Sequence, residues 1–173
     1  IYFAQIAQYR YAGEECTSAG YMMWAQAQTL EDMPFSGMVT THDVGSRWVI
    51  HPPKKKQVGD RFAYLALSND YGFKDIEAKT PMPKEFVFDG DKAIVRFDVS
   101  KLGVGPINSD LSGFELAGED RVFHPAVARV DKDCMSVTVI SSQVAKPIAV
   151  RYGIRNWSEA TLFNSFGIPV SPF

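Results

Sequence analysis

The chain has 173 residues, of which 46% are hydrophobic and 13% aromatic, so it can bury a core and does not resemble a disordered segment. Its formal net charge of −2 provides no basic surface, which makes nucleic acids and anionic membranes poor partners. Its apolar runs are shorter than the roughly 18 residues that a membrane-spanning helix needs. Its length allows one domain or two small ones.

The first 70 residues alternate between strands and helices. The pattern predicts a strand at about residues 1–7, a helix at 18–31, a strand at 37–42 and a helix at 54–68. Pro52 and Pro53 favour the start of the second helix, because proline tolerates the first helical turn. This order is typical of an α/β domain with a parallel sheet. Two strands cannot form such a sheet with both faces covered, so we expect part of the domain to lie upstream of Ile1.

After Gly72 the hydrophobic pattern changes from helical to alternating. Residues 84–88 and 93–97 are predicted to form a hairpin, because Asp89 and Gly90 supply the turn chemistry between them. Further strands are predicted at 114–116, 122–130, 135–140 and 148–154. Short strands at this spacing are typical of a β-sandwich or a jelly-roll-like module. The sequence thus divides into an α/β part, residues 1–70, and a β-rich module, residues 71–173.

Cys16 and Cys134 lie far apart in the sequence and in different predicted units, so we interpret both as free. No paired cysteine or histidine spacing typical of zinc occurs. We therefore expect neither a metal nor a cofactor.

His51 is the strongest candidate for catalysis. It lies in the loop between the second predicted strand and the second predicted helix, where α/β folds place their chemistry. A histidine can also exchange a proton near neutral pH. The alternative is that a lone histidine before proline only packs or caps the loop. His42 and His124 receive less weight, because His42 falls on a strand end and His124 in the β-rich module.

The residues around His51 resemble the histidine block of the SGNH esterases, in particular the sialate O-acetylesterase branch. The matching positions of this block are Ile50, His51, Pro52, Lys55 or Lys56, Val58, Gly59, Arg61 and Ala63. Other segments are similar to the same family in the same order: Tyr2-Phe3-Ala4-Gln5-Ile6-Ala7, Gly113-Phe114-Glu115-Leu116-Ala117-Gly118, Ala149-Val150-Arg151-Tyr152-Gly153 and Ser171-Pro172-Phe173. The resemblance therefore extends over nearly the whole chain.

The resemblance implies that this chain is the C-terminal part of a flavodoxin-like, three-layer SGNH domain followed by the β-rich module. The family's Gly-Gln-Ser-Asn-Met nucleophile block and its Gly-Glu-Ser-Asn segment do not occur in these 173 residues, so we expect the serine and the oxyanion donors upstream. The partners implied are the missing N-terminal part and an O-acetylated sugar.

The resemblance also implies an activity: hydrolysis of O-acetyl groups on sialic acid through an acetyl-serine intermediate, in a periplasmic or secreted protein. The rival substrates are acetyl xylan or another acetylated glycan. A rival of another class is a non-catalytic carbohydrate-binding or docking module, with the β-rich half carrying that role.

The group that orients His51 is open at this stage. Many SGNH enzymes have an aspartate three residues before the histidine, but Trp48 occupies that position here. Asp43 matches an acidic position of the acetylesterase branch and could hold the ring. A backbone carbonyl could hold it instead, in a Ser–His dyad. Asp43-Val44-Gly45 is also compatible with simple turn chemistry.

Overall fold

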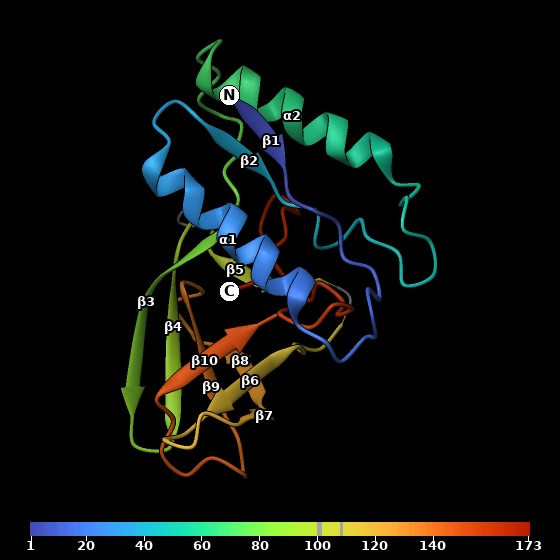
Figure 1. Ribbon diagram of the computed structural model, residues 1–173. Coiled ribbons are helices and arrows are strands. Elements are labelled where there is room, and N and C mark those ends of the chain that lie inside the picture. The colour runs from blue at the N-terminus through green and yellow to red at the C-terminus, as the bar shows by residue number, and fades with distance from the viewer. Residues whose placement is uncertain (100–101, 108) are drawn as a thin grey trace.

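The computed structural model describes residues 1–99, 102–107 and 109–173 (Figure 1). It contains two helices and four small sheets. In chain order the elements are β1 (Tyr2–Ala4), α1 (Ser18–Asp32), β2 (Gly37–Val39), α2 (Lys55–Asn69), β3 (Met82–Asp89), β4 (Lys92–Asp98), β5 (Val104–Pro106), β6 (Phe114–Ala117), β7 (Phe123–Pro125), β8 (Val127–Val130), β9 (Ser136–Ile140), β10 (Ala149–Tyr152) and β11 (Leu162–Asn164). Within the described ranges, no helix has the length and apolar character that crossing a membrane requires.

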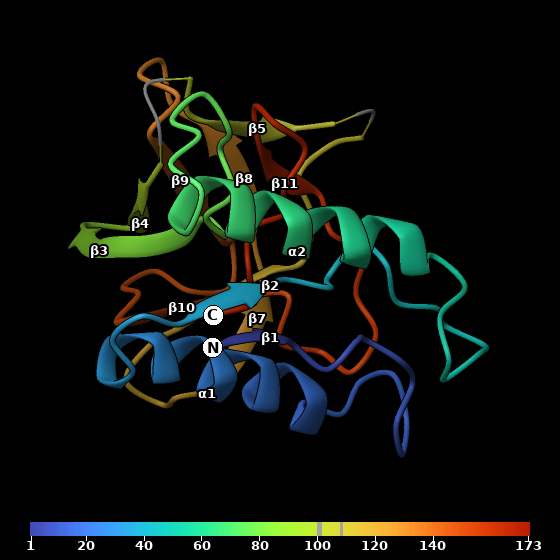
Figure 2. The ribbon, with the colours of Figure 1, turned by 90° about the horizontal axis from the view of Figure 1, so that it is seen from above.

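β1 and β2 form a parallel pair that lies between the two helices, with α1 on one face and α2 on the other (Figure 2). The inner side of α1 carries Ala19, Met23 and Ala27, which recur every fourth residue and are all buried. Leu65 of α2 packs against Val39 of β2 in a small core of its own. Both helices match their predicted ranges within a residue or two, whereas the strands are shorter than predicted.

The β-rich part consists of antiparallel sheets around one larger core. The four-stranded sheet has the order β3-β4-β9-β8, a three-stranded sheet has the order β10-β6-β7, and β11 pairs with β5. The core between them contains Ala93, Val95, Phe97, Val104, Phe114, Leu116, Ala128, Val137, Val139, Val144, Tyr152, Leu162, Val170 and Phe173. This arrangement fits the predicted sandwich-like module. The predicted hairpin is confirmed: Asp89 pairs with Lys92, and Gly90 adopts a φ of 61° in the turn.

One predicted strand is wrong. Residues 122–130 were expected to be continuous, but they form β7 and β8 with Ala126 between them. β7 pairs with β6 and β8 pairs with β9, so the chain passes from one sheet to the other at this point. The alternating pattern could not reveal this, because alternation indicates which residues face inward but not which sheet a strand joins. β5 and β11 were not predicted.

Both cysteines are free, as predicted, and both are exposed. Cys134 lies in the turn before β9 rather than in the strand, with a φ of 55°.

The segment after β10 returns to the α/β part and packs against it. Gln8, in the loop after β1, donates to the carbonyl of Gly153 at 2.8 Å. The side chain of Asn156 accepts a hydrogen bond from the amide of Ala19 at 2.8 Å, at the start of α1. Gln5 donates to the hydroxyl of Ser171 at 2.7 Å. The division at residue 70 stays a prediction, since residues from both sides of it contribute to these contacts.

Candidate functional site

The candidate site lies at the carboxyl ends of β1 and β2. The chain leaves β1 through Gln5 and Gln8, and it leaves β2 through Thr40, Thr41 and His42. In open α/β sheets, ligands bind beyond the carboxyl ends of the strands, where loops and helix starts meet. The loop that follows carries Asp43 and His51 before α2 begins. Asp43 therefore lies close to the edge of the sheet where chemistry is expected, whereas His51 lies eight residues farther along the loop.

His42 is buried at this edge and both nitrogens of its ring have partners. Nδ1 lies 3.2 Å from the carbonyl oxygen of Val170, and Nε2 lies 3.1 Å from Oγ of Ser158. Because a carbonyl can only accept, Nδ1 carries the proton and Nε2 accepts from the Ser158 hydroxyl. The ring also packs edge-on against Tyr152, with centroids 5.4 Å apart. His42 is thus fixed in one orientation and one tautomer.

Burial lowers the pKa of His42 from 6.5 to about 4, although the Val170 carbonyl and the charge of Asp43 oppose this shift. The ring is therefore neutral near neutral pH. A base with so low a pKa has little driving force to take a proton from serine, so the Ser158–His42 contact is a poor nucleophile–base pair. Gln8 also donates to Oγ of Ser158 at 3.2 Å. We assign this network a structural role: it joins the strand end to the C-terminal segment.

A cavity of about 390 Å³ opens beside this network. Its lining comes from the end of β2, the loop before α2 and the C-terminal segment: His42, Asp43, Gly45, Lys54, Trp157, Ser158, Glu159, Ala160 and Phe163. His51 does not contribute to this lining. The cavity shows that the edge of the sheet is hollowed, with polar and aromatic side chains around it.

Asp43 is engaged by Arg61 of α2 and not by His51. The guanidinium donates to its two carboxylate oxygens at 2.7 and 2.6 Å. Nη1 of Arg61 also donates to the carbonyl of Thr40 at 2.9 Å, and the side chains of Asp43 and Arg61 are only 22% and 10% exposed. Lys54 donates to the backbone carbonyl of Asp43 at 3.1 Å. An orienting role of Asp43 toward His51 stays a prediction, and this geometry gives it no support.

His51 lies exposed in the loop before α2, and its ring makes no hydrogen bond to any residue that the structure describes. The loop is unusually apolar for an exposed segment, since Trp48, Val49 and Ile50 are 63%, 52% and 48% exposed. Exposed apolar side chains that lie together, as they do around the accessible ring of His51, are typical of a surface that contacts another part of a protein.

Trp48, at the position where the SGNH pattern has an acid, is held by cations. The guanidinium of Arg10 lies 4.3 Å from the centre of its ring, and that of Arg47 lies 5.2 Å away. Arg47 is in turn bound by the carboxylate of Glu14, at 2.6 and 2.5 Å. The residue that replaces the acid thus fixes the loop against the segment before α1.

Some of the residues at this edge of the sheet could be predicted from the sequence, and others could not. Arg61 had a signal, since it belongs to the histidine block, but its contact with Asp43 was not predicted. Gln8 and Ser158 had no signal, because Ser158 reaches both Gln8 and His42 only through folding, across 150 and 116 residues of chain. No group of three or more histidine, cysteine or acidic side chains that could hold a metal ion occurs among the described residues.

The comparison with solved structures shows a similarity to XAC1771, a novel carbohydrate acetylesterase from Xanthomonas citri. The two share 35% sequence identity with a TM-score of 0.90, over 99% of this chain and 40% of that chain. A scan against protein-family models gives no match, and neither does a comparison with curated proteins. The chain thus shares the fold of a segment that makes up 40% of a carbohydrate acetylesterase.

Proposed function

We propose that this chain is the C-terminal part of a serine carbohydrate acetylesterase and that it supplies the catalytic base, His51. The observation that carries the proposal is the similarity to XAC1771, which extends over 99% of the chain. The chain spans only 40% of that protein, which leaves room for the nucleophile and oxyanion segments that the histidine block implies. The exposed loop around His51 fits such a neighbour.

The parallel pair of strands supports the same proposal. β1 and β2 are covered on both faces by α1 and α2 (Figure 2). Parallel sheets covered on both faces are normally larger than two strands. In the proposed domain the remaining strands of an SGNH, flavodoxin-like sheet come from upstream sequence and continue this pair.

The proposed chemistry is acyl transfer in two steps. In the first step, His51 takes the proton from the upstream serine hydroxyl as its oxygen attacks the acetyl carbonyl. His51 then gives that proton to the departing sugar oxygen, which leaves an acetyl-serine. In the second step, His51 takes a proton from a water molecule as that water attacks the acetyl carbonyl of the acetyl-serine. His51 then gives this proton to the serine oxygen as the acyl–oxygen bond breaks, which releases acetic acid, ionised to acetate in solution, and restores the serine hydroxyl and the neutral imidazole. Each step needs an imidazole that can reach the serine, and His51 is exposed.

We propose that a backbone carbonyl orients His51, giving a Ser–His dyad. Asp43 already has both carboxylate oxygens on Arg61, and Trp48 occupies the usual acidic position. A carbonyl fixes the tautomer as His42 shows in the same chain, where Val170 accepts from Nδ1.

The proposed substrate is O-acetylated sialic acid, as the resemblance of the histidine block implies. Acetyl xylan or another acetylated glycan is the rival, and the name of XAC1771 supports carbohydrate acetylesters in general. A periplasmic or secreted location, which the same resemblance implies, is part of the proposal.

The test compares the intact polypeptide with the 173-residue chain alone. Acetate release is measured with 9-O-acetylsialic acid, with acetylated xylan and with an activated acetate ester. The proposal expects turnover by the intact polypeptide and none by the isolated chain, because the serine lies outside it. Acetate release from acetylated xylan but not from 9-O-acetylsialic acid would contradict the proposal that sialic acid is the substrate. Turnover by the isolated chain at the rate of the intact polypeptide would contradict the proposal that the catalytic serine lies outside this chain. Sugar binding without any ester hydrolysis by the intact polypeptide would favour the non-catalytic module instead.

A further inference from the structure

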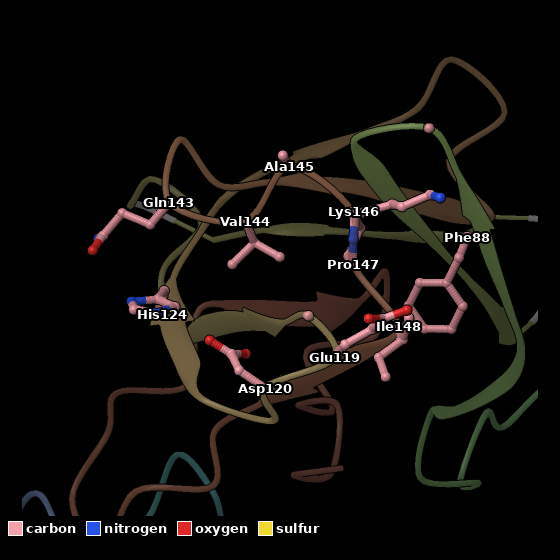
Figure 3. Close-up of a pocket in the computed structure, with 12 residues that line it drawn as sticks. Phe88, Glu119, Asp120, His124, Gln143, Val144, Ala145, Lys146, Pro147 and Ile148 are labelled. Atoms are coloured by element: carbon pink, nitrogen blue, oxygen red, sulfur yellow. The ribbon is translucent and has the colours of Figure 1, made fainter.

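A second and larger cavity, of about 710 Å³, lies in the β-rich part at the end remote from α2 (Figure 1, Figure 3). Three connections build it: the β3–β4 turn, the β6–β7 turn and the loop from β9 to β10. Its lining residues are Phe88, Gly90, Gly118, Glu119, Asp120, His124, Gln143, Val144, Ala145, Lys146, Pro147 and Ile148. Its volume falls within the range of small-molecule binding sites.

The backbone around this cavity is held by hydrogen bonds, so the cavity is formed before any ligand arrives. The amide of Ile148 donates to Ala117 at 2.9 Å, which ties the long loop to β6. The amide of Arg121 donates to Gly118 at 2.9 Å and closes the β6–β7 turn. Val144, which belongs to the main core, and Pro147 are buried, so they anchor this loop to the β-rich part. A preformed site loses less entropy when a ligand binds.

The polar side chains of the cavity keep most of their hydrogen-bonding capacity. Within the described part of the chain, Glu119, Gln143 and Lys146 make no side-chain hydrogen bond or ion pair, although Lys146 shares the cavity with two carboxylates. Asp120 uses one oxygen to accept from the amide of Val122 at 3.1 Å. Carboxylate and amide groups placed in this way can bind neighbouring hydroxyl groups of one ligand.

One wall is apolar. Figure 3 shows the ring of Phe88 and the side chain of Ile148 on one side of the cavity, with His124 and Gln143 on the other. Phe88 is 40% exposed and Ile148 is 51% exposed, so both present apolar surface to solvent. An exposed aromatic ring attracts the C–H face of a pyranose, because the ring face is electron-rich and the sugar face is apolar with slightly positive hydrogens.

We propose that this cavity is a binding subsite for an uncharged oligosaccharide. The combination of one exposed aromatic ring, two carboxylates, an amide and a lysine matches the alternation of apolar faces and hydroxyl groups on a sugar. Glu119 and Asp120 outweigh Lys146 in formal charge, so a sugar acid is repelled relative to a neutral sugar. The inference does not rest on the proposed esterase activity, because no residue of the cavity belongs to the edge of the sheet that carries His51.

The test measures binding by calorimetry with the intact polypeptide that carries His51→Ala, so that hydrolysis does not interfere. The neutral probes are cellohexaose and xylohexaose, and the acidic probes are hexagalacturonic acid and sialyllactose. We expect at least one neutral probe to bind. Phe88→Ala should weaken that binding on the order of tenfold, and Phe88→Trp should restore it. Asp120→Asn, which keeps an oxygen for the amide of Val122, should weaken it as well.

Phe166→Ala is the matched control, because Phe166 is an exposed phenylalanine outside the cavity. It should leave the affinity unchanged. Three results would each overturn the proposal: no binding of either neutral probe at millimolar concentration, equal effects of Phe88→Ala and Phe166→Ala, or tighter binding of the acidic probes. Thermal unfolding of each variant shows whether it is folded. If Phe88→Ala does not fold, the affinity of Phe88→Trp for the neutral probe tests the role of the aromatic ring instead.

Discussion

Arg61 donates to both carboxylate oxygens of Asp43, at 2.7 and 2.6 Å. The same guanidinium reaches the carbonyl of Thr40, so one side chain of α2 fastens the carboxyl end of β2. The loop that carries His51 begins at this point. The pair therefore positions the loop through the backbone, and its effect on catalysis is expected to be indirect.

Asp43→Asn should reduce stability more than turnover. The amide cannot replace a bidentate carboxylate, so Arg61 is left poorly paired in a mostly buried place, at a cost of about 3 kcal/mol. Urea unfolding measures this loss. Asp60→Asn is the control, since its pair with Lys56 is exposed and contributes about 0.5 kcal/mol or less. A loss of kcat by orders of magnitude in a folded Asp43→Asn enzyme would instead make Asp43 the orienting acid.

The stability of the protein should fall between pH 6.5 and 4 because of His42. Burial lowers the pKa of His42 from 6.5 to about 4 in the folded state. Over this window the unfolded chain binds a proton that the folded protein does not, so protonation favours unfolding. The contribution of His42 is complete above pH 6.5 and decreases by about 3 kcal/mol as the pH reaches 4.

This pH dependence is isolated by comparing the protein with His42→Gln. The free energy of unfolding is measured in urea from pH 7 to pH 4, and the difference between the two proteins should shrink as the pH falls. Parallel curves for the protein and His42→Gln would contradict a lowered pKa.

Gly153→Ala should destabilise the fold more than Gly167→Ala. Both glycines have a left-handed φ, of 66° and 74°. A Cβ at Gly153 would lie 2.6 Å from Cε1 of His42, whereas no atom lies within 4 Å of one at Gly167. Gly167→Ala should therefore cost about 1 kcal/mol for backbone strain alone, and Gly153→Ala about 3 kcal/mol or more. Equal losses in thermal or urea unfolding would show that the His42 ring does not pack against Gly153.

Ser158→Ala should reduce stability without reducing ester turnover. Removing Oγ leaves Nε2 of His42 without its donor, which costs about 1–2 kcal/mol. Acetate release by the intact polypeptide should keep its kcat, since the nucleophile is proposed to lie upstream. Loss of all turnover in a folded Ser158→Ala protein would identify Ser158 and His42 as the reacting pair.

The sequence predicted local structure correctly where a short stretch of residues carries a clear pattern. The two helices were found because their apolar residues recur at helical spacing, and the β3–β4 hairpin because Asp89-Gly90 fits a tight turn. The passage from β7 to β8 was missed because strand pairing is a long-range property. Phe123–Pro125 and Val127–Val130 lie in one stretch that was predicted as a single strand, yet they join different sheets.

The candidate site was predictable only in part, for the same reason. His51 was found because a continuous block of residues surrounds it. The network of His42 brings together residues from the first 42 positions and from the last part of the chain, and nothing in their local sequence indicates a contact. The role of Asp43 toward His51 stays a prediction, and its contact with Arg61 could not be predicted, because folding brings together two residues that lie 18 positions apart.

The measurement that tests the central proposal most directly is kcat of the intact polypeptide carrying His51→Ala. If His51 is the general base, kcat for acetate release should fall by on the order of 10²–10⁴-fold or more, while urea unfolding stays unchanged because the ring is exposed and makes no hydrogen bond to the described residues. His124→Ala, measured in parallel on the activated acetate ester, which does not need the proposed sugar subsite, should keep full activity. A His51→Ala polypeptide that retains most of its kcat would contradict the account and assign the catalytic base to another residue.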